Sequence, residues 1–301
     1  MMARTDDIRK RQSARRRLRR ETPSTVAVLA DERDFAAMRR YPSFGFDDHP
    51  AYLRHVEGLL RALAARGTPT SVALFDPGEF ADYCDRAGLD PDSPASRTRY
   101  IAEVAAAGGT VAYEGQPVAR LLPRLVDEAC RQATWEYATR LLARSGCPAC
   151  GDDPGREPFA RALRALRAIL EALGGGTHHL VCSVPTESGA PLVAVLGAHC
   201  DDTGGLRLDE PSALLFCTVL AASATTEHPG GIVVRSHRPG RQDTVRGWSL
   251  RRGRTRPLDE AQVFAAYCTD PVTGEPVPPE PGVAYEAGIA LDPGEDDGKE
   301  T

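Results

Sequence analysis

Hydrophobic and polar residues follow two different rhythms along this chain of 301 residues. In the first half, short apolar runs of strand length are separated by segments with apolar residues at three- and four-residue spacing, the period of an amphipathic helix. Glycine and proline mark the junctions. The strands predicted from this pattern are Thr25–Ala30, Thr70–Phe75 and Thr110–Tyr113. The predicted helices are Ala51–Arg66, Glu79–Ala87, Ser96–Ala107 and Val118–Ala143.

Strands that alternate with helices through short connections are typical of a parallel α/β sheet. We therefore expect residues 23–146 to form an α/β domain with a short parallel sheet. The long helix at the end of this segment would pack on one face of that sheet.

The second half begins with a predicted helix, Phe159–Leu173, and then changes to a strand-like period. The connection Thr186–Pro191 predicts a hairpin between the first two strands. We expect residues 147–291 to form an α+β domain with a mainly antiparallel sheet. Its predicted strands are His179–Val184, Leu192–Leu196, Ile232–Arg235 and Thr244–Leu250.

Charge is distributed unevenly along the chain, whose net charge is -5. Residues 1–20 hold nine basic and two acidic residues, so this segment carries +7 and the remainder -12. We expect residues 1–22 to form a basic flexible arm and residues 292–301 an acidic disordered tail. Such an arm either contacts a polyanion or is simply solvated.

Composition favours a globular protein in the cytoplasm. Hydrophobic residues make up 42% and charged residues 26%, which are ordinary values. No segment reaches the roughly 18 apolar residues that span a bilayer. Eight cysteines without a regular framework fit a reducing compartment. Only two of the 37 basic residues are lysine, a bias typical of a GC-rich genome.

The sharpest motif is Cys147-Pro148-Ala149-Cys150-Gly151. A proline and a glycine here turn the backbone so that two thiolates can face one tetrahedral ion, as in a zinc knuckle. His179 and Cys182 would complete a structural zinc site, although a regular strand would point them to opposite faces. The alternative is a pair of reduced structural thiols.

A second cluster lies at the open end of the predicted hairpin. With a turn near Ser188, we expect His178 opposite His199, with Cys200 beside them. Imidazoles and a thiol at one sheet edge could bind a metal or form an acid–base pair. The alternative is a group of surface histidines near a turn.

Three acidic residues follow the predicted parallel strands: Asp31, Asp76 and Glu114. Ligands of open α/β sheets bind at the carboxyl ends of the strands, so these carboxylates could hold Mg²⁺ for phosphate-ester hydrolysis. They could equally cap the following helices. The chain contains no Gly-x-Gly-x-x-Gly and no Walker-type loop, which gives no support to a standard nucleotide cradle.

The stretch Arg235–Arg256 contains eight arginines and one acid, Asp243. On a strand from Val245 onward, alternate residues would share one face and combine guanidinium groups with an exposed indole. That combination suits single-stranded nucleic acid or an acidic protein surface. The residues assigned to this contact are Arg235, Arg246, Trp248, Arg252 and Arg254.

Two functions follow from these patterns. The first is a binding or regulatory protein that contacts nucleic acid or an acidic protein surface, with zinc in a structural role. The second is a metal-dependent hydrolase with Asp31, Asp76 and Glu114 as its Mg²⁺ site. We favour the first, because two separate basic segments support it.

Overall fold

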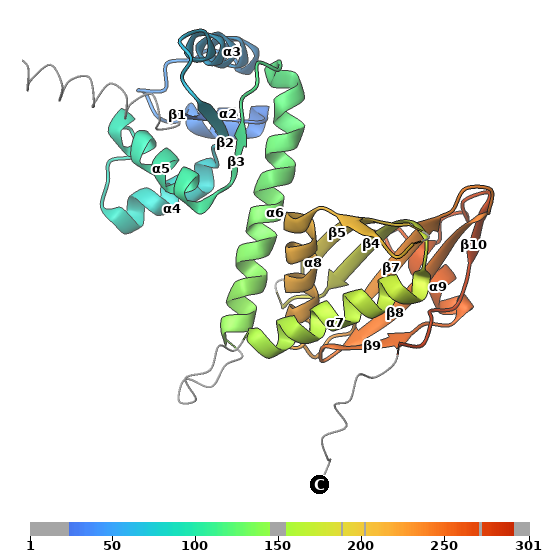
Figure 1. Ribbon diagram of the computed structural model, residues 1–301. Coiled ribbons are helices and arrows are strands. Elements are labelled where there is room, and N and C mark those ends of the chain that lie inside the picture. Colours follow the sequence, from blue (N-terminus) through green and yellow to red (C-terminus); the bar gives the residue numbers. More distant parts are fainter. Residues whose placement is uncertain (1–23, 145–154, 188, 202, 271–272, 292–301) are drawn as a thin grey trace, which may run out of the picture. The chain divides into compact units, whose positions relative to one another are not determined.

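The computed structural model describes residues 24–144, 155–187, 189–201, 203–270 and 273–291. The chain divides into two compact units, Met1–Gln132 and Ala133–Thr301 (Figure 1). The basic arm, the cysteine pair Cys147 and Cys150, and the acidic tail lie outside the described residues.

The N-terminal unit contains a three-stranded sheet in the order β1-β2-β3. Its strands are β1 (Ser24–Val28), β2 (Thr70–Leu74) and β3 (Thr110–Ala112). β1 and β2 are parallel, as the sequence predicts, but β3 runs antiparallel to β2. The expectation of an all-parallel sheet is therefore wrong for its third strand.

Helices surround this sheet, and each of the first four begins at a polar cap. They are α2 (Glu32–Met38), α3 (His49–Ala65), α4 (Pro77–Ala87) and α5 (Pro94–Ala107). Asp31, Asp48, Asp76 and Ser93 accept hydrogen bonds from the first-turn amides of these helices. α2, which is only seven residues long, has no counterpart among the helices predicted from the sequence.

The helix α6 (Val118–Arg144) contributes to the cores of both units. Its first half supplies Val118, Leu121 and Leu125 to the N-terminal core, and its second half supplies Ala138 and Leu142 to the C-terminal core. The division of the chain falls inside this helix, between Gln132 and Ala133. The predicted boundary after residue 146 differs because it assigned the whole helix to the first domain.

The C-terminal unit is built on a seven-stranded sheet in the order β10-β8-β7-β4-β5-β6, with β9 paired to β8. Among the described residues, all its pairings are antiparallel except that of β8 with β10. The prediction of a mainly antiparallel sheet is thus confirmed. The strands are β4 (Gly176–Val184), β5 (Leu192–Cys200), β6 (Leu206–Leu208), β7 (Gly230–His237), β8 (Asp243–Arg251), β9 (Arg254–Pro257) and β10 (Val283–Tyr285).

Two helices, α7 (Arg156–Leu173) and α8 (Glu210–Ala222), cover one face of this sheet (Figure 1). The largely apolar residues 213–222 form most of α8, and residues 215–222 are buried in the core. The third helix, α9 (Glu260–Tyr267), packs Val263 against Val245 and Val283. Because Val245 and Trp248 belong to separate buried clusters and point to opposite faces, α9 covers part of the other face near β8 and β10.

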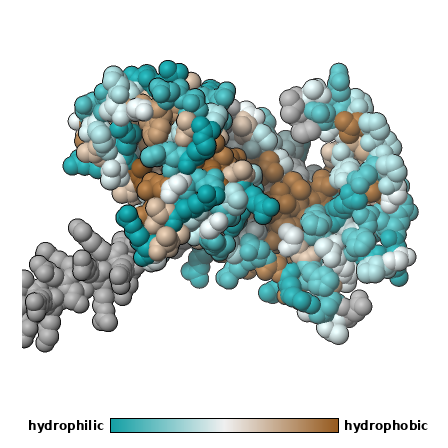
Figure 2. All heavy atoms as spheres, turned by 90° about the horizontal axis from the view of Figure 1, so that it is seen from above, coloured by the Kyte–Doolittle hydropathy of each residue, from teal (hydrophilic) through white to brown (hydrophobic). Residues whose placement is uncertain are grey.

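In the view of Figure 2, hydrophilic residues lie mainly toward the periphery, and hydrophobic residues are visible in the middle. Across the described helices, none combines the length and the apolar character that crossing a bilayer requires.

Candidate anion-binding pocket

A pocket of about 420 Å³ opens in the C-terminal unit, between the end of α7 and the strands β7, β8 and β10. This volume lies in the range of small-molecule sites, which runs from about 300 to 1,000 Å³. Its wall combines three arginines and one glutamate with neutral polar and apolar residues. The lining residues are Ala172, Leu173, Ser236, Arg238, Arg241, Gln242, Thr244, Arg246, Ala284, Glu286 and Ile289.

A tight turn brings two of these arginines together. The amide of Arg241 donates to the carbonyl of Arg238 over 3.1 Å, and Pro239-Gly240 fills the two central positions. Gly240 has a φ of 74°, as the third residue of a type II turn requires. Since the ends of a β-turn lie within about 7 Å of each other, Arg238 and Arg241 form neighbouring parts of the pocket wall.

Arg238 is held against the end of α7. Its Nη2 donates to the carbonyl of Leu173, which satisfies a terminal acceptor of the helix and places a cation at the negative end of the helix dipole. Its Nε is fully buried and has no hydrogen-bond partner among the described residues. A buried donor without an acceptor is costly, so a ligand that draws the side chain of Arg238 toward the cavity would relieve this cost.

Arg246 and Glu286 form an ion pair in the wall of the pocket. Arg246 donates through Nη2 to Glu286 and through Nη1 to the carbonyl of Ala287 over 2.9 Å. Two residues after Ala287, the carbonyl of Ile289 accepts a 2.9 Å hydrogen bond from the buried indole of Trp248. These contacts fasten residues 286–289 along β8, so this segment forms a fixed wall of the pocket.

A buried histidine supports the pocket from behind. His178 has 0% of its surface exposed, and its Nε2 donates to the carbonyl of Gly174 over 3.0 Å. Its Nδ1 therefore accepts from the hydroxyl of Ser236, 2.8 Å away, and Ser236 lines the pocket. Burial, and to a lesser extent the charge of Arg238, lowers the pKa of His178 and keeps the imidazole neutral.

The lining can therefore hold a ligand with a negatively charged group. Glu286 offsets the charge of Arg246, while Arg241 is exposed and makes no ion pair with a described residue. Guanidinium groups bind carboxylate and phosphate oxygens through charge-assisted hydrogen bonds. Gln242, Thr244 and Ser236 add neutral donors and acceptors, and Leu173 and Ile289 add apolar surface.

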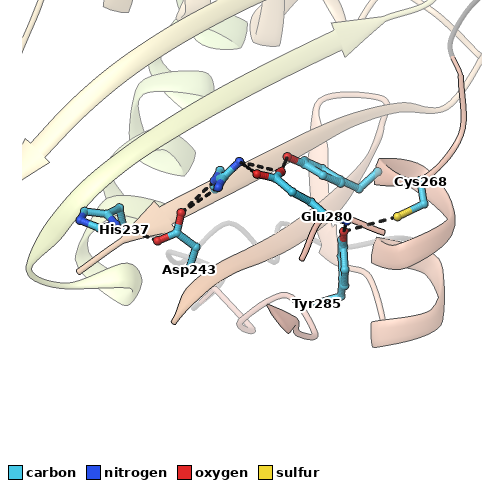
Figure 3. Close-up of polar contacts among 7 residues, drawn as sticks. His237, Asp243, Cys268, Glu280 and Tyr285 are labelled. Atoms are coloured by element: carbon cyan, nitrogen blue, oxygen red, sulfur yellow. Dashed lines mark hydrogen bonds and ion pairs between the residues drawn. The ribbon is translucent and has the colours of Figure 1, made fainter. Parts of the chain in front are cut away.

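The arginine predicted to begin the polyanion contact instead belongs to a polar network (Figure 3). Arg235 donates to Asp243 over 2.9 and 3.0 Å and to both carboxylate oxygens of Glu280 over 2.8 and 2.9 Å. His237 lies 2.7 Å from Asp243 at one end of the network, and Tyr285 lies toward the other. His237 first, and then Arg235, lower the pKa of Asp243.

The predicted exposed face with an indole is wrong. Trp248 has 0% of its surface exposed, because it shares the core-facing side of β8 with Leu250. Arg246 pairs with Glu286, and Arg252, which lies in a turn beyond the end of β8, pairs with Glu227 over 3.1 Å. Of the assigned residues, Arg254 is exposed without an ion-pair partner in the described part of the chain.

The four-ligand zinc site conflicts with the geometry of β4. His179 and Cys182 point to opposite faces of this regular strand, His179 outward and Cys182 into the core. Burial raises the pKa of the Cys182 thiol, which opposes the thiolate that zinc needs. Zinc binding by Cys147 and Cys150 stays a prediction, since both lie outside the described residues.

The expected histidine cluster is wrong by one residue of register. Val184 pairs with Leu192, so Thr177 rather than His178 lies opposite His199. This register puts the apolar residues of both strands on one face, whereas a shift by one residue would separate them. His178 is consequently a core residue, and Cys200 lies on that same side while His199 faces outward.

The carboxylate site is only partly assembled. Asp31 and Asp76 lie at the same edge of the sheet, and burial, followed by their charges, raises the pKa of Asp34 beside them. Glu114 lies at the opposite edge because β3 is antiparallel. Within the described ranges, no group of three or more His, Cys, Asp or Glu residues is placed to hold a metal ion.

The polyanion contact predicted from the basic segment includes neither Arg238 nor Arg241, although both line the pocket. The signal for these two residues was Arg-Pro-Gly-Arg, a type II turn sequence between two predicted strands. Glu286 and Ile289 had no comparable signal, since they follow a three-residue strand that the pattern did not reveal.

Comparisons with known proteins add one finding. A sequence family described as a domain of unknown function (DUF8829) matches residues 13–116, about a third of the chain. Neither the search of curated proteins nor the search of solved structures found a match. The matched segment lies within the N-terminal unit, so the pocket lies outside it.

Proposed function

We propose that the C-terminal unit binds a small organic anion in the pocket lined by Arg238, Arg241 and Arg246. The observation that carries this proposal is the convergence of three guanidinium groups on one cavity, with Glu286 as the one acid in its lining. The buried, unpartnered Nε of Arg238 supports it. The ligand carries a phosphate or carboxylate group and an apolar part that fits beside Leu173 and Ile289.

The proposed ligand is an anion, as expected from the basic segment, but it is a small molecule instead of a polymer. Of the four arginines assigned to a polymer, Arg235, Arg246 and Arg252 are paired with acidic side chains, and Arg254 alone has no ion pair in the described structure. The hydrolase alternative receives less support, because Asp31 and Asp76 already cap helices and Glu114 lies at the other edge of the sheet.

Calorimetric titration of the full chain tests the proposal, with inorganic pyrophosphate, citrate and adenosine monophosphate as probes. Arg241→Gln is the informative variant because its exposed side chain makes no ion pair in the described structure. Loss of a charge-assisted hydrogen bond costs about 1.5–3 kcal/mol, so we expect affinity to fall at least about tenfold.

The matched control is Arg167→Gln, which removes the same charge from an exposed position of α7 that does not line the pocket. We expect its affinity to equal that of the natural chain. The proposal fails if no probe binds at millimolar concentration, or if both variants weaken binding equally.

A further inference from the structure

The hairpin formed by β8 and β9 presents three arginines on one face. Arg251 lies directly opposite Arg254, and Ser249 lies directly opposite Arg256. Because side chains alternate along a strand, these four residues share the face opposite to Leu250. All three arginines are exposed, and their side chains make no ion pair or hydrogen bond with another described residue.

This arrangement is unfavourable in isolation. Directly opposed residues of an antiparallel pair have Cβ atoms about 5 Å apart, and like charges there destabilise the pair. Arg251 and Arg254 are such a pair, and Arg256 is two residues from Arg254 on the same face. None of the three arginines forms an ion pair with an acidic side chain of the described structure.

The turn of the hairpin carries a second local cost. Arg252 has a φ of 48°, and among the described residues it is the one residue other than glycine with a positive φ. Gly253 follows with a φ of 73°, so the two form a type I′ turn, for which Asn-Gly is the usual sequence. Opposed like charges and a non-glycine residue at positive φ are both unfavourable locally, and unfavourable features of this kind are expected at functional sites.

Beside the arginines, this face carries a row of small residues, bounded by α9 over Gly247 and by the exposed Val193 of β5. Ser183, Gly231 and Ser249 follow one another across β4, β7 and β8 in the same row as Arg256. The hydroxyl of Ser249 donates to the carbonyl of Arg256 over 3.3 Å, and the amides of these inner strands are paired within the sheet. The three arginines are therefore the main donors to phosphate oxygens on this face.

We propose that this surface, Arg251, Arg254, Arg256 and Ser249, binds the phosphate backbone of duplex nucleic acid. β8 pairs with β7 as well as with β9, so the hairpin is part of the sheet and contacts phosphates through its outward face. Unpaired bases would need an aromatic platform, but the tryptophan of this hairpin, Trp248, is buried. The surface lies on the side of β8 opposite to the pocket-lining Arg246, so it is separate from the anion pocket.

Fluorescence anisotropy of a labelled DNA duplex, titrated with the full chain at several salt concentrations, tests the proposal. Three phosphate contacts give a slope of about -2.7 for the logarithm of affinity against the logarithm of salt concentration. Affinity then falls about 40-fold between about 50 and 200 mM salt. We expect the triple variant R251Q/R254Q/R256Q to reduce the magnitude of the slope by about this amount.

A matched triple variant, R33Q/R54Q/R99Q, removes the same charge from exposed positions of the N-terminal unit and should leave the slope unchanged. Equal slopes for the hairpin variant and the natural chain would overturn the proposal. So would tighter binding of labelled polyglutamate or of anionic lipid vesicles than of the duplex. Pyrophosphate binding in the pocket is unaffected by either result, which keeps the two proposals distinguishable.

Discussion

Replacing Gly288 by alanine tests how the wall of the pocket is built. Gly288 lies between Glu286 and Ile289, on the segment that the indole of Trp248 and the guanidinium of Arg246 fasten to β8. A Cβ atom at this position would overlap the carbonyl oxygen of Gly247 and lie 3.0 Å from Cα and Cβ of Pro257. Two of these three atoms belong to the backbone, so the segment itself has to move.

The magnitude follows from two contributions. Forcing an extra carbon into a packed site costs typically about 1–3 kcal/mol. Displacement of the segment also breaks the 2.9 Å hydrogen bond from Trp248 to the carbonyl of Ile289, which contributes about 1 kcal/mol. We expect the free energy of unfolding of the C-terminal unit to fall by about 2–4 kcal/mol and the urea midpoint to fall by about 1 M or more.

Tryptophan fluorescence measures this change in the correct unit, because both tryptophans, Trp135 and Trp248, lie in Ala133–Thr301. The control is Gly197→Ala, on the outward side of β5, where a new Cβ meets nothing within 4 Å. Alanine loses less conformational entropy on folding than glycine does, so the urea midpoint of Gly197→Ala should be unchanged or slightly higher. Equal midpoints for Gly288→Ala and the natural chain would refute the reasoning.

Three further predictions follow from the described contacts. Burial lowers the pKa of His178, so as pH falls the imidazole is protonated in the unfolded chain before it is protonated in the folded one. The C-terminal unit should therefore lose stability below about pH 6.5, by at most about 1.4 kcal/mol per pH unit. Urea titrations of His178→Gln should show a flatter dependence on pH. Alkylation of the native protein mapped by mass spectrometry should modify the exposed Cys130 and spare Cys182 and Cys217, because burial raises the pKa of Cys217 to about 11 and that of Cys182 as well; rapid modification of Cys182 would contradict its place in the core. Asp76→Ala should lower the stability of the N-terminal unit, measured by circular dichroism, by about 1 kcal/mol because α4 loses its cap. A larger difference in stability between the variant and the natural chain in the presence of Mg²⁺ would support the Mg²⁺ site.

The sequence predicts the elements of this fold better than their arrangement. Apolar spacing locates α3, α6 and α7 because each buries one side against a core. It cannot fix the direction of a three-residue strand such as β3, since either direction buries the same side chains. That direction decides whether Glu114 joins Asp31 and Asp76, so the carboxylate site could not be settled from the sequence.

The candidate site shows a similar limit. The eight arginines of Arg235–Arg256 are visible in the sequence, but their partners come from distant segments. Glu280 and Glu286 follow β8 by about thirty residues or more and neutralise Arg235 and Arg246. The position of Trp248 depends on which face of β8 meets α7 and α8, and an exposed indole and a buried one give the same alternating pattern.

The most direct test of anion binding is the Nε–H signal of Arg238 in a nitrogen–proton correlation spectrum, recorded while inorganic pyrophosphate is added. Loss of one signal in Arg238→Lys assigns it. The buried Nε lacks an acceptor in the described structure, so we expect its signal to shift and saturate as pyrophosphate binds beside the guanidinium group of Arg238. We expect Arg241→Gln to weaken this saturation. A signal that stays fixed while those of Arg251 or Arg254 shift would contradict the account.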